Sequence, residues 1–274
     1  YDRDLEDIFA LQDEMIETIV RAIEPELGRA ERERARRKPP GSLDAWELFQ
    51  RGLWYHYRFT RDNNAEAKRC FHRAIEVDPT FALPFAALAH AHYWDALFGY
   101  TADIKKTLAD GLELARKAVS LDDREPFAHF ALGRVQTLSG KLEGAIAELE
   151  QAIDLNPNFA HAYYGLGLAL VWAGQPAEAL DRIDTALRLN PRDPSAWTFQ
   201  GGRAIALLLL DRLDEAADWA RRSTQSVSDN LWPHGIEAAV LAHLGRGREA
   251  AAALAQVYRL KPDFSAEFVR QVFP

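Results

Sequence analysis

Two consecutive stretches of 34 residues decide the fold of this chain. Residues 126–159 read PFAHFALGRVQTLSGKLEGAIAELEQAIDLNPNF, and residues 160–193 read AHAYYGLGLALVWAGQPAEALDRIDTALRLNPRD. Aligned at an offset of 34, they share five landmarks: Gly133 with Gly167, Ala145 with Ala179, Leu149 with Ile183, Ala152 with Ala186, and Pro157 with Pro191. Matches at a single offset indicate an internal repeat, which outweighs any domain count based on length.

Each landmark has a physical role in a pair of packed helices. Glycine or alanine at the eighth, twentieth and twenty-seventh places of the repeat lets two helix axes approach closely. Large side chains such as Tyr163, Leu166 and Ile183 follow helical spacing and supply the core between the helices. Pro157 and Pro191 end the second helix, because proline disfavours helical geometry in the residue before it. The repeat is therefore predicted to be a helix–turn–helix unit.

The length of the repeat and the order of its small, large and proline positions resemble the tetratricopeptide repeat. Extending the template in both directions predicts an all-α fold, a right-handed α-α superhelix of about six helical hairpins. Its units are expected, within an array spanning 43–274, over residues 45–81, 82–125, 126–159, 160–193, 194–230 and 231–264. A partial C-terminal helix over 265–274 is expected to cover the last hairpin, since terminal repeats need a cap.

The first 42 residues do not follow the repeat. Apolar residues from Leu5 to Ile23 form one stripe at helical spacing and predict an amphipathic helix over 1–25, ended by Pro25. This helix is expected to be the end of an upstream domain or a cap on the array. Residues 26–42 are rich in Arg and Glu and finish with proline and glycine, which is typical of a charged linker.

The opening residues, YDRDLEDIFALQDE at positions 1–14, resemble a junction in bacterial multidomain signalling proteins. That junction leads into the C-terminal repeats of class III adenylate or guanylate cyclases, and of similarly arranged winged-helix transcription regulators. The aromatic segments 54–57 and 96–100 extend the resemblance along most of the chain. The resemblance implies that a catalytic or DNA-binding domain precedes Tyr1, so no cyclase residue is carried over.

Composition excludes several classes of function. A net charge of −8 argues against nucleic-acid binding by this region, because phosphates require a surplus of Lys and Arg. The longest aliphatic run, 204–210, is too short to cross a membrane. Cys70 is the single cysteine, which excludes an intramolecular disulfide and fits a cytoplasmic protein. No catalytic, cofactor or metal motif is present, so we expect neither an enzymatic site nor a cofactor in this region.

A candidate partner groove follows from the second, fifth, ninth and twelfth places of the units, which line the concave face of such arrays. In the first four units, with one further tryptophan, these places give Trp46, Phe49, His56, Leu83, His90, Tyr93, Phe127, Phe130, Arg134, His161, Tyr164, Leu168 and Trp172. This lining is aromatic and carries little charge. It favours an apolar helical segment, from another protein or another domain, over a charged peptide tail. The alternative is that these aromatics pack between neighbouring hairpins.

The predicted function is therefore a protein-interaction or regulatory module of a bacterial multidomain signalling protein, with an adenylate or guanylate cyclase as the first candidate. A winged-helix regulator and a stand-alone adaptor are the alternatives. Trp232, Phe264 and Phe268 near the last unit are expected either to cover the end of the array or to support a weak homodimer.

Overall fold

The computed structural model describes Gly28, Arg32 and residues 43–273, which form thirteen helices and no strand. The predicted amphipathic helix over 1–25 and the predicted linker over 26–42 lie outside the described residues, apart from Gly28 and Arg32. The helices are α2 (Ala45–His56), α3 (Arg61–Val77), α4 (Ala82–Phe98), α5 (Ile104–Leu121), α6 (Pro126–Leu138), α7 (Leu142–Leu155), α8 (Ala160–Trp172), α9 (Pro176–Leu189), α10 (Ala196–Leu209), α11 (Leu213–Ser226), α12 (Leu231–His243), α13 (Gly247–Leu260) and α14 (Ala266–Val272).

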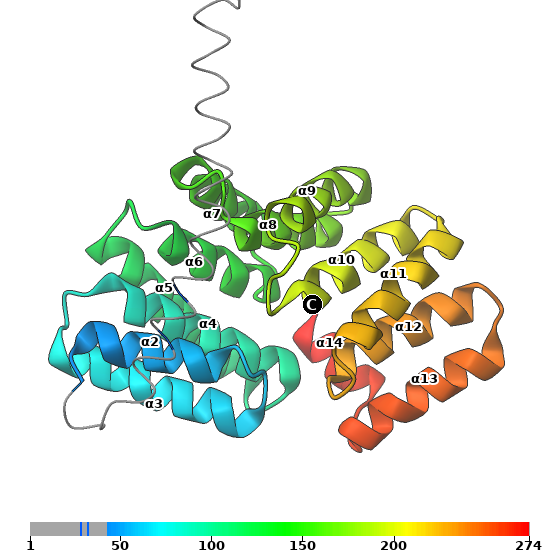
Figure 1. Ribbon diagram of the computed structural model, residues 1–274, viewed down its shortest axis with the longest axis horizontal. Helices are drawn as coiled ribbons and strands as arrows, with labels where there is room; N and C mark the ends of the chain where they lie inside the picture. The colour runs from blue at the N-terminus through cyan, green and yellow to red at the C-terminus, as the bar shows by residue number, and fades with distance from the viewer. Residues whose placement is uncertain (1–27, 29–31, 33–42, 274) are drawn as a thin grey trace, which may run out of the picture.

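Consecutive helices pair into hairpins, from α2 with α3 to α12 with α13, and the hairpins stack in chain order. Figure 1 shows them following one another around an arc, with α14 near its centre. The predicted all-α superhelix of hairpins is therefore confirmed. The second hairpin is the largest, because α4 and α5 have 17 and 18 residues where α6 and α7 have 13 and 14. No described helix is both long and apolar enough to cross a bilayer.

Local sequence signals begin and end these helices. The carboxylate of Asp44 accepts a hydrogen bond from the amide of Glu47 at 2.8 Å, and Asp103 caps α5 in the same way at 2.9 Å. In the turns of the third, fourth and sixth hairpins stand Gly140, Gly174 and Gly245, with φ angles of 70°, 78° and 73°. Glycine suits these positions because it enters the left-handed region without a steric penalty.

The glycines at the eighth place of the repeat permit the close approach of the paired helices. A Cβ atom on Gly133 would lie 2.6 Å from Cγ of Leu149, and one on Gly167 would lie 2.5 Å from Cγ1 of Ile183. Leu149 and Ile183 are fully buried in the core that joins the third to sixth hairpins. The small residues of the repeat thus set the distance between the two helices of each hairpin.

The arc curves until its two ends meet. The indole Nε1 of Trp232, on α12, donates a hydrogen bond to the carbonyl oxygen of Leu97, on α4, at 3.1 Å. The ring of Phe59, between α2 and α3, lies 5.5 Å from that of Trp197 on α10. One apolar cluster accordingly includes buried residues from the second hairpin and from the last one.

Helix α14 completes this closure. Phe268 stacks beside Trp232 at 6.1 Å, so α14 does pack on the last hairpin. Phe268 and Val272 also belong to the apolar cluster that contains α4 residues, and a Cβ on Gly99 would meet the Phe268 ring at 2.7 Å. Trp232, Phe264 and Phe268 therefore have packing partners within the chain.

Candidate functional site

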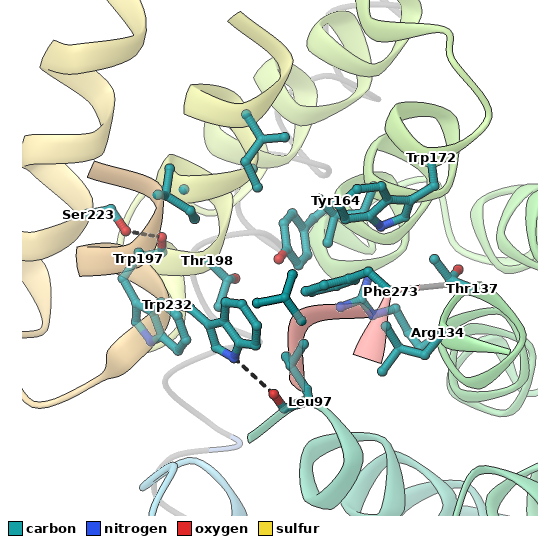
Figure 2. A pocket seen from close by; sticks show the side chains of 18 of the residues that line it. Leu97, Arg134, Thr137, Tyr164, Trp172, Trp197, Thr198, Ser223, Trp232 and Phe273 are labelled. Atoms are coloured by element: carbon teal, nitrogen blue, oxygen red, sulfur yellow. Dashed lines mark hydrogen bonds between the residues drawn. The ribbon is translucent and has the colours of Figure 1, made fainter. Parts of the chain in front are cut away.

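A cavity of about 380 Å³ lies at the centre of the arc. Its walls come mainly from α4, α6, α8, α10 and α12, the first helices of the second to sixth hairpins, and α14 contributes Val269 with Phe264 and Phe273 beside it. Figure 2 shows the aromatic side chains of Tyr164, Trp172, Trp232 and Phe273 turned towards this space. First helices face inwards because the second helices pack on their outer side.

Five of the predicted groove residues line this cavity: Tyr93, Arg134, Tyr164, Leu168 and Trp172. They come from three successive hairpins, so the structure brings them together around one space. Trp172 keeps 39% of its surface exposed, and its ring lies 4.8 Å from that of Phe273.

Five others, His56, His90, Phe127, Phe130 and His161, line a neighbouring cavity of about 60 Å³. Arg134 and Tyr164 line both cavities and so separate them. Phe130 keeps only 2% of its surface exposed, and its ring packs 5.2 Å from that of Phe159 and 5.1 Å from His90. This part of the predicted groove consists of side chains packed between hairpins.

The remaining three predicted residues line neither of these cavities. Phe49 is buried in a core cluster with Phe71, and Leu83 packs against the same cluster. Trp46 is 43% exposed and lies 6.2 Å from Phe81, measured between ring centroids. Of the residues predicted in the first hairpin, His56 alone lines the small cavity, beside Tyr57 and Phe59.

Sequence reasoning missed the walls supplied by the fifth and sixth hairpins. The same places of the template that selected the groove in the first four units hold Thr198, Gly202 and Ile205 in the fifth unit, and Trp232, Gly235 and Ala239 in the sixth. All six of these residues line the central cavity. The signal was therefore present in the repeat. Phe273 carried no such signal, because it follows the repeats.

Arg134 is the charged side chain of the central cavity. It is 1% exposed and donates a hydrogen bond from Nη2 to the hydroxyl of Tyr93. Its guanidinium carbon lies 4.4 Å from the ring centroid of Tyr93 and 5.1 Å from that of Tyr164. Nε and Nη1 are buried without a hydrogen-bond partner among the described residues. Burial raises the pKa of both tyrosines, which keeps their hydroxyls protonated beside the cation.

A chain of buried polar rings borders the small cavity. The indole of Trp94 donates to Nε2 of His56 at 3.0 Å, and Nδ1 of His90 lies 3.1 Å from the same nitrogen. An indole only donates, so Nε2 of His56 accepts and Nδ1 of His90 carries a proton. Burial lowers the pKa of His56 to about 4 and that of His90 well below its usual value, so both rings are neutral near pH 7.

His161, Ser195 and Asp193 also meet here, but not in the order of a catalytic triad. The Ser195 hydroxyl donates to Oδ1 of Asp193 at 2.5 Å, and Nε2 of His161 lies 2.9 Å from that hydroxyl. In a triad the serine proton goes to the histidine, and the carboxylate holds the other ring nitrogen. Here Asp193 also accepts from the Ser195 amide at 2.7 Å, so the cluster shapes the turn before α10. No three metal-ligating side chains converge among the described residues.

Comparisons with known proteins agree with this architecture. A family model described as "TPR repeat" matches residues 133–174, and one described as "Tetratricopeptide repeat" matches residues 164–230. A protein of Rhizobium meliloti (strain 1021) named "Putative adenylate cyclase 3" is 33% identical over 145 residues, or 53% of this chain and 25% of that protein. The chain thus spans about a quarter of the length of this relative.

Two solved structures show the same fold at low sequence identity. The crystal structure of the APC/C hetero-tetramer Cut9–Hcn1 is 16% identical with a TM-score of 0.66, over 93% of this chain and 47% of that one. The human IFIT1 dimer with m7Gppp-AAAA is also 16% identical, with a TM-score of 0.68 over 78% of this chain and 50% of that one. At this identity the likeness concerns the fold alone.

Proposed function

We propose that the array is the regulatory, partner-binding region of a bacterial multidomain cyclase. Matches to tetratricopeptide repeat models over residues 133–230 support this proposal, because such repeats serve as protein-interaction modules. The cyclase would be of the class III adenylate or guanylate type. Catalysis would then belong to another part of the protein, and this region would bind a partner and transmit its presence.

The observation that carries this proposal is the likeness to the Rhizobium meliloti protein. The match covers 53% of this chain but only 25% of that protein, so three-quarters of the relative lies outside the match. That remainder is long enough for a catalytic domain. The likeness favours a cyclase over a winged-helix regulator or an adaptor.

The packing of α14 supports an apolar helix as the kind of partner. This helix lies at the inner side of the array, with Phe268 and Val272 buried and Phe273 beside Trp172 and Trp232. The inner surface therefore already holds one apolar helix, contributed by the chain itself. We infer that a partner helix, or a helix of another domain, takes the place of α14.

The test uses the whole protein. First, the coding sequence before Tyr1 is read for a cyclase domain, and nucleotide cyclisation is then measured for the full-length protein. A Phe268→Ala and Phe273→Ala double variant is compared with wild type. We expect a changed cyclase activity, because the variant weakens the contact that α14 makes with the inner surface.

Val77→Ala is the matched control, since Val77 is 55% exposed on α3 and outside both cavities. An upstream sequence without any catalytic domain would overturn the assignment to a cyclase. Equal activities of wild type and the double variant, with the fold intact by circular dichroism, would show that the contact of α14 with the inner surface does not affect cyclase activity.

A further inference from the structure

We propose that the central cavity binds a small organic monoanion, a carboxylate with an apolar body, and that Arg134 pairs with the carboxylate. The juxtaposition that carries this proposal is a buried, incompletely bonded guanidinium at the wall of an apolar cavity. The proposal goes beyond the regulatory role above and does not depend on whether the upstream domain is a cyclase.

Arg134 is 1% exposed, and no carboxylate among the described residues forms an ion pair with it. A buried charge without a counter-ion is unfavourable, because burial removes its hydration and no opposite charge replaces it. Tyr93 satisfies one N–H group, while Nε and Nη1 have no partner. A carboxylate matches the planar fork of a guanidinium and would supply both the missing charge and the missing acceptors.

Of the described residues that line the central cavity, Arg134 is the only charged one. A nucleotide or another polyphosphate would require several cations or a metal ion, and its extra charges would meet apolar walls. One arginine with aromatic neighbours therefore selects a single negative charge.

The cavity measures about 380 Å³, which is within the range of roughly 300–1,000 Å³ typical of small-molecule sites. Trp197, Trp232, Ile205 and Leu208 supply apolar surface around it. An alkyl chain or an aromatic ring would remain in contact with these walls, and its carboxylate would reach the guanidinium of Arg134 once the side chains that cover Nε and Nη1 move aside. A free phosphate or acetate would leave most of the space unfilled.

The cavity adjoins the segment that closes the array. Val269 and Phe273, in and after α14, form part of its wall. A bound body would therefore contact α14 and the first helices at once, so binding should hold the closed arrangement more firmly.

The test compares two probes with the same tail, decanoate and 1-decanol, on the full chain by isothermal titration calorimetry. Tryptophan fluorescence gives a second readout, since Trp94, Trp172, Trp197 and Trp232 line the cavity. We expect decanoate to bind at least tenfold more tightly than 1-decanol. Arg134→Met should abolish this preference while leaving 1-decanol binding unchanged, and Arg134→Lys should restore part of it.

Arg182→Met, which removes an exposed arginine from α9, is the matched control and should keep the preference for decanoate. Ala239→Trp keeps Arg134 but fills the cavity, so it should weaken the binding of both probes. Arg134→Met should fold, since it replaces a buried charge by an apolar chain of similar length. Equal affinities of the two probes for wild type, an unchanged decanoate affinity in Arg134→Met, or no binding of either probe would each overturn the proposal.

Discussion

Gly167 shows how much of this fold depends on a single missing methyl group. A Cβ at this position would lie 2.5 Å from Ile183 Cγ1 and 3.1 Å from the carbonyl oxygen of Ala179. A side chain can shift, but the backbone of α9 cannot move without opening the hairpin. Gly167→Ala is therefore expected to destabilise the chain by about 1–3 kcal/mol, the usual cost of overpacking a core.

Gly235 provides the control for that substitution. It lies inside α12, and no atom is within 4 Å of where its Cβ would be. Gly235→Ala should be neutral or stabilise by up to about 1 kcal/mol, because alanine is the better helix former. Urea unfolding monitored by circular dichroism measures both variants. A stable Gly167→Ala would show that the paired helices tolerate a wider separation.

The buried histidines predict how stability varies with pH. The pKa of His56 is lowered from 6.5 to about 4 by burial, so the folded chain binds fewer protons than the unfolded chain between these values. His56 therefore costs no stability above pH 6.5, and the free energy of unfolding falls as the pH drops from 6.5 towards 4. Its share is at most about 1.4 kcal/mol per pH unit.

His56→Gln should flatten this acid branch, since glutamine does not titrate and its amide oxygen can accept from the Trp94 indole. Unfolding free energies at pH 7 and pH 5 provide the comparison, with His234→Gln as the control because His234 is a histidine outside both cavities. Identical pH dependence in wild type and His56→Gln would contradict a neutral, buried His56.

At the scale of single elements, the hairpin turns rely on backbone conformation more than on contacts. Gly245, in the turn between α12 and α13, has a φ angle of 73°, whereas Gly247 begins α13 without a positive φ. No atom lies within 4 Å of a Cβ built on either glycine. Gly245→Ala should therefore cost about 1–2 kcal/mol through strain alone, and Gly247→Ala should be neutral or slightly stabilising. Thermal melts that rank the two variants in the opposite order would contradict this account.

The helices and their pairing could be predicted because their signals are local. Gly133 and Leu149 meet within one hairpin, and Pro157 ends the same unit. A pattern of 34 residues is therefore enough to predict the hairpin. Part of the cavity wall was predictable for the same reason. Tyr164 and Leu168 occupy repeat places that face inwards in each unit.

The sequence could not predict in the same way which residues of the candidate groove are buried. Phe130 occupies an inward place like Tyr164, but the ring of Phe159, the residue just before α8, packs against it and leaves it only 2% exposed. Its exposure depends on how closely two hairpins stack, which is a tertiary property. The unpartnered nitrogens of Arg134 are hidden from the sequence for the same reason, since no local pattern shows that a carboxylate is missing.

At the scale of the whole molecule, contacts between distant residues decide the shape. Trp232 and Leu97 are 135 positions apart in the chain, yet they share a hydrogen bond across the arc. No repeat period encodes such a contact, because it depends on the summed rotation from one hairpin to the next. Helix α14 adds Phe268 and Val272 to the same junction.

This junction leads to a prediction about shape. A chain lacking residues 264–274 loses the apolar side chains of Phe264, Phe268, Val272 and Phe273, and with them much of the contact between the second and sixth hairpins. Each hairpin should stay folded, because its two helices pack directly on one another. Small-angle X-ray scattering should therefore report a larger radius of gyration with unchanged helix content, and a synthetic 264–274 peptide added in trans should reverse part of the expansion. A Glu267→Ala and Gln271→Ala variant, altered only on the exposed face of α14, should keep the wild-type radius. If the truncated chain also keeps it, the curvature is set by the stacking of neighbouring hairpins alone, and α14 only covers a surface that is already closed.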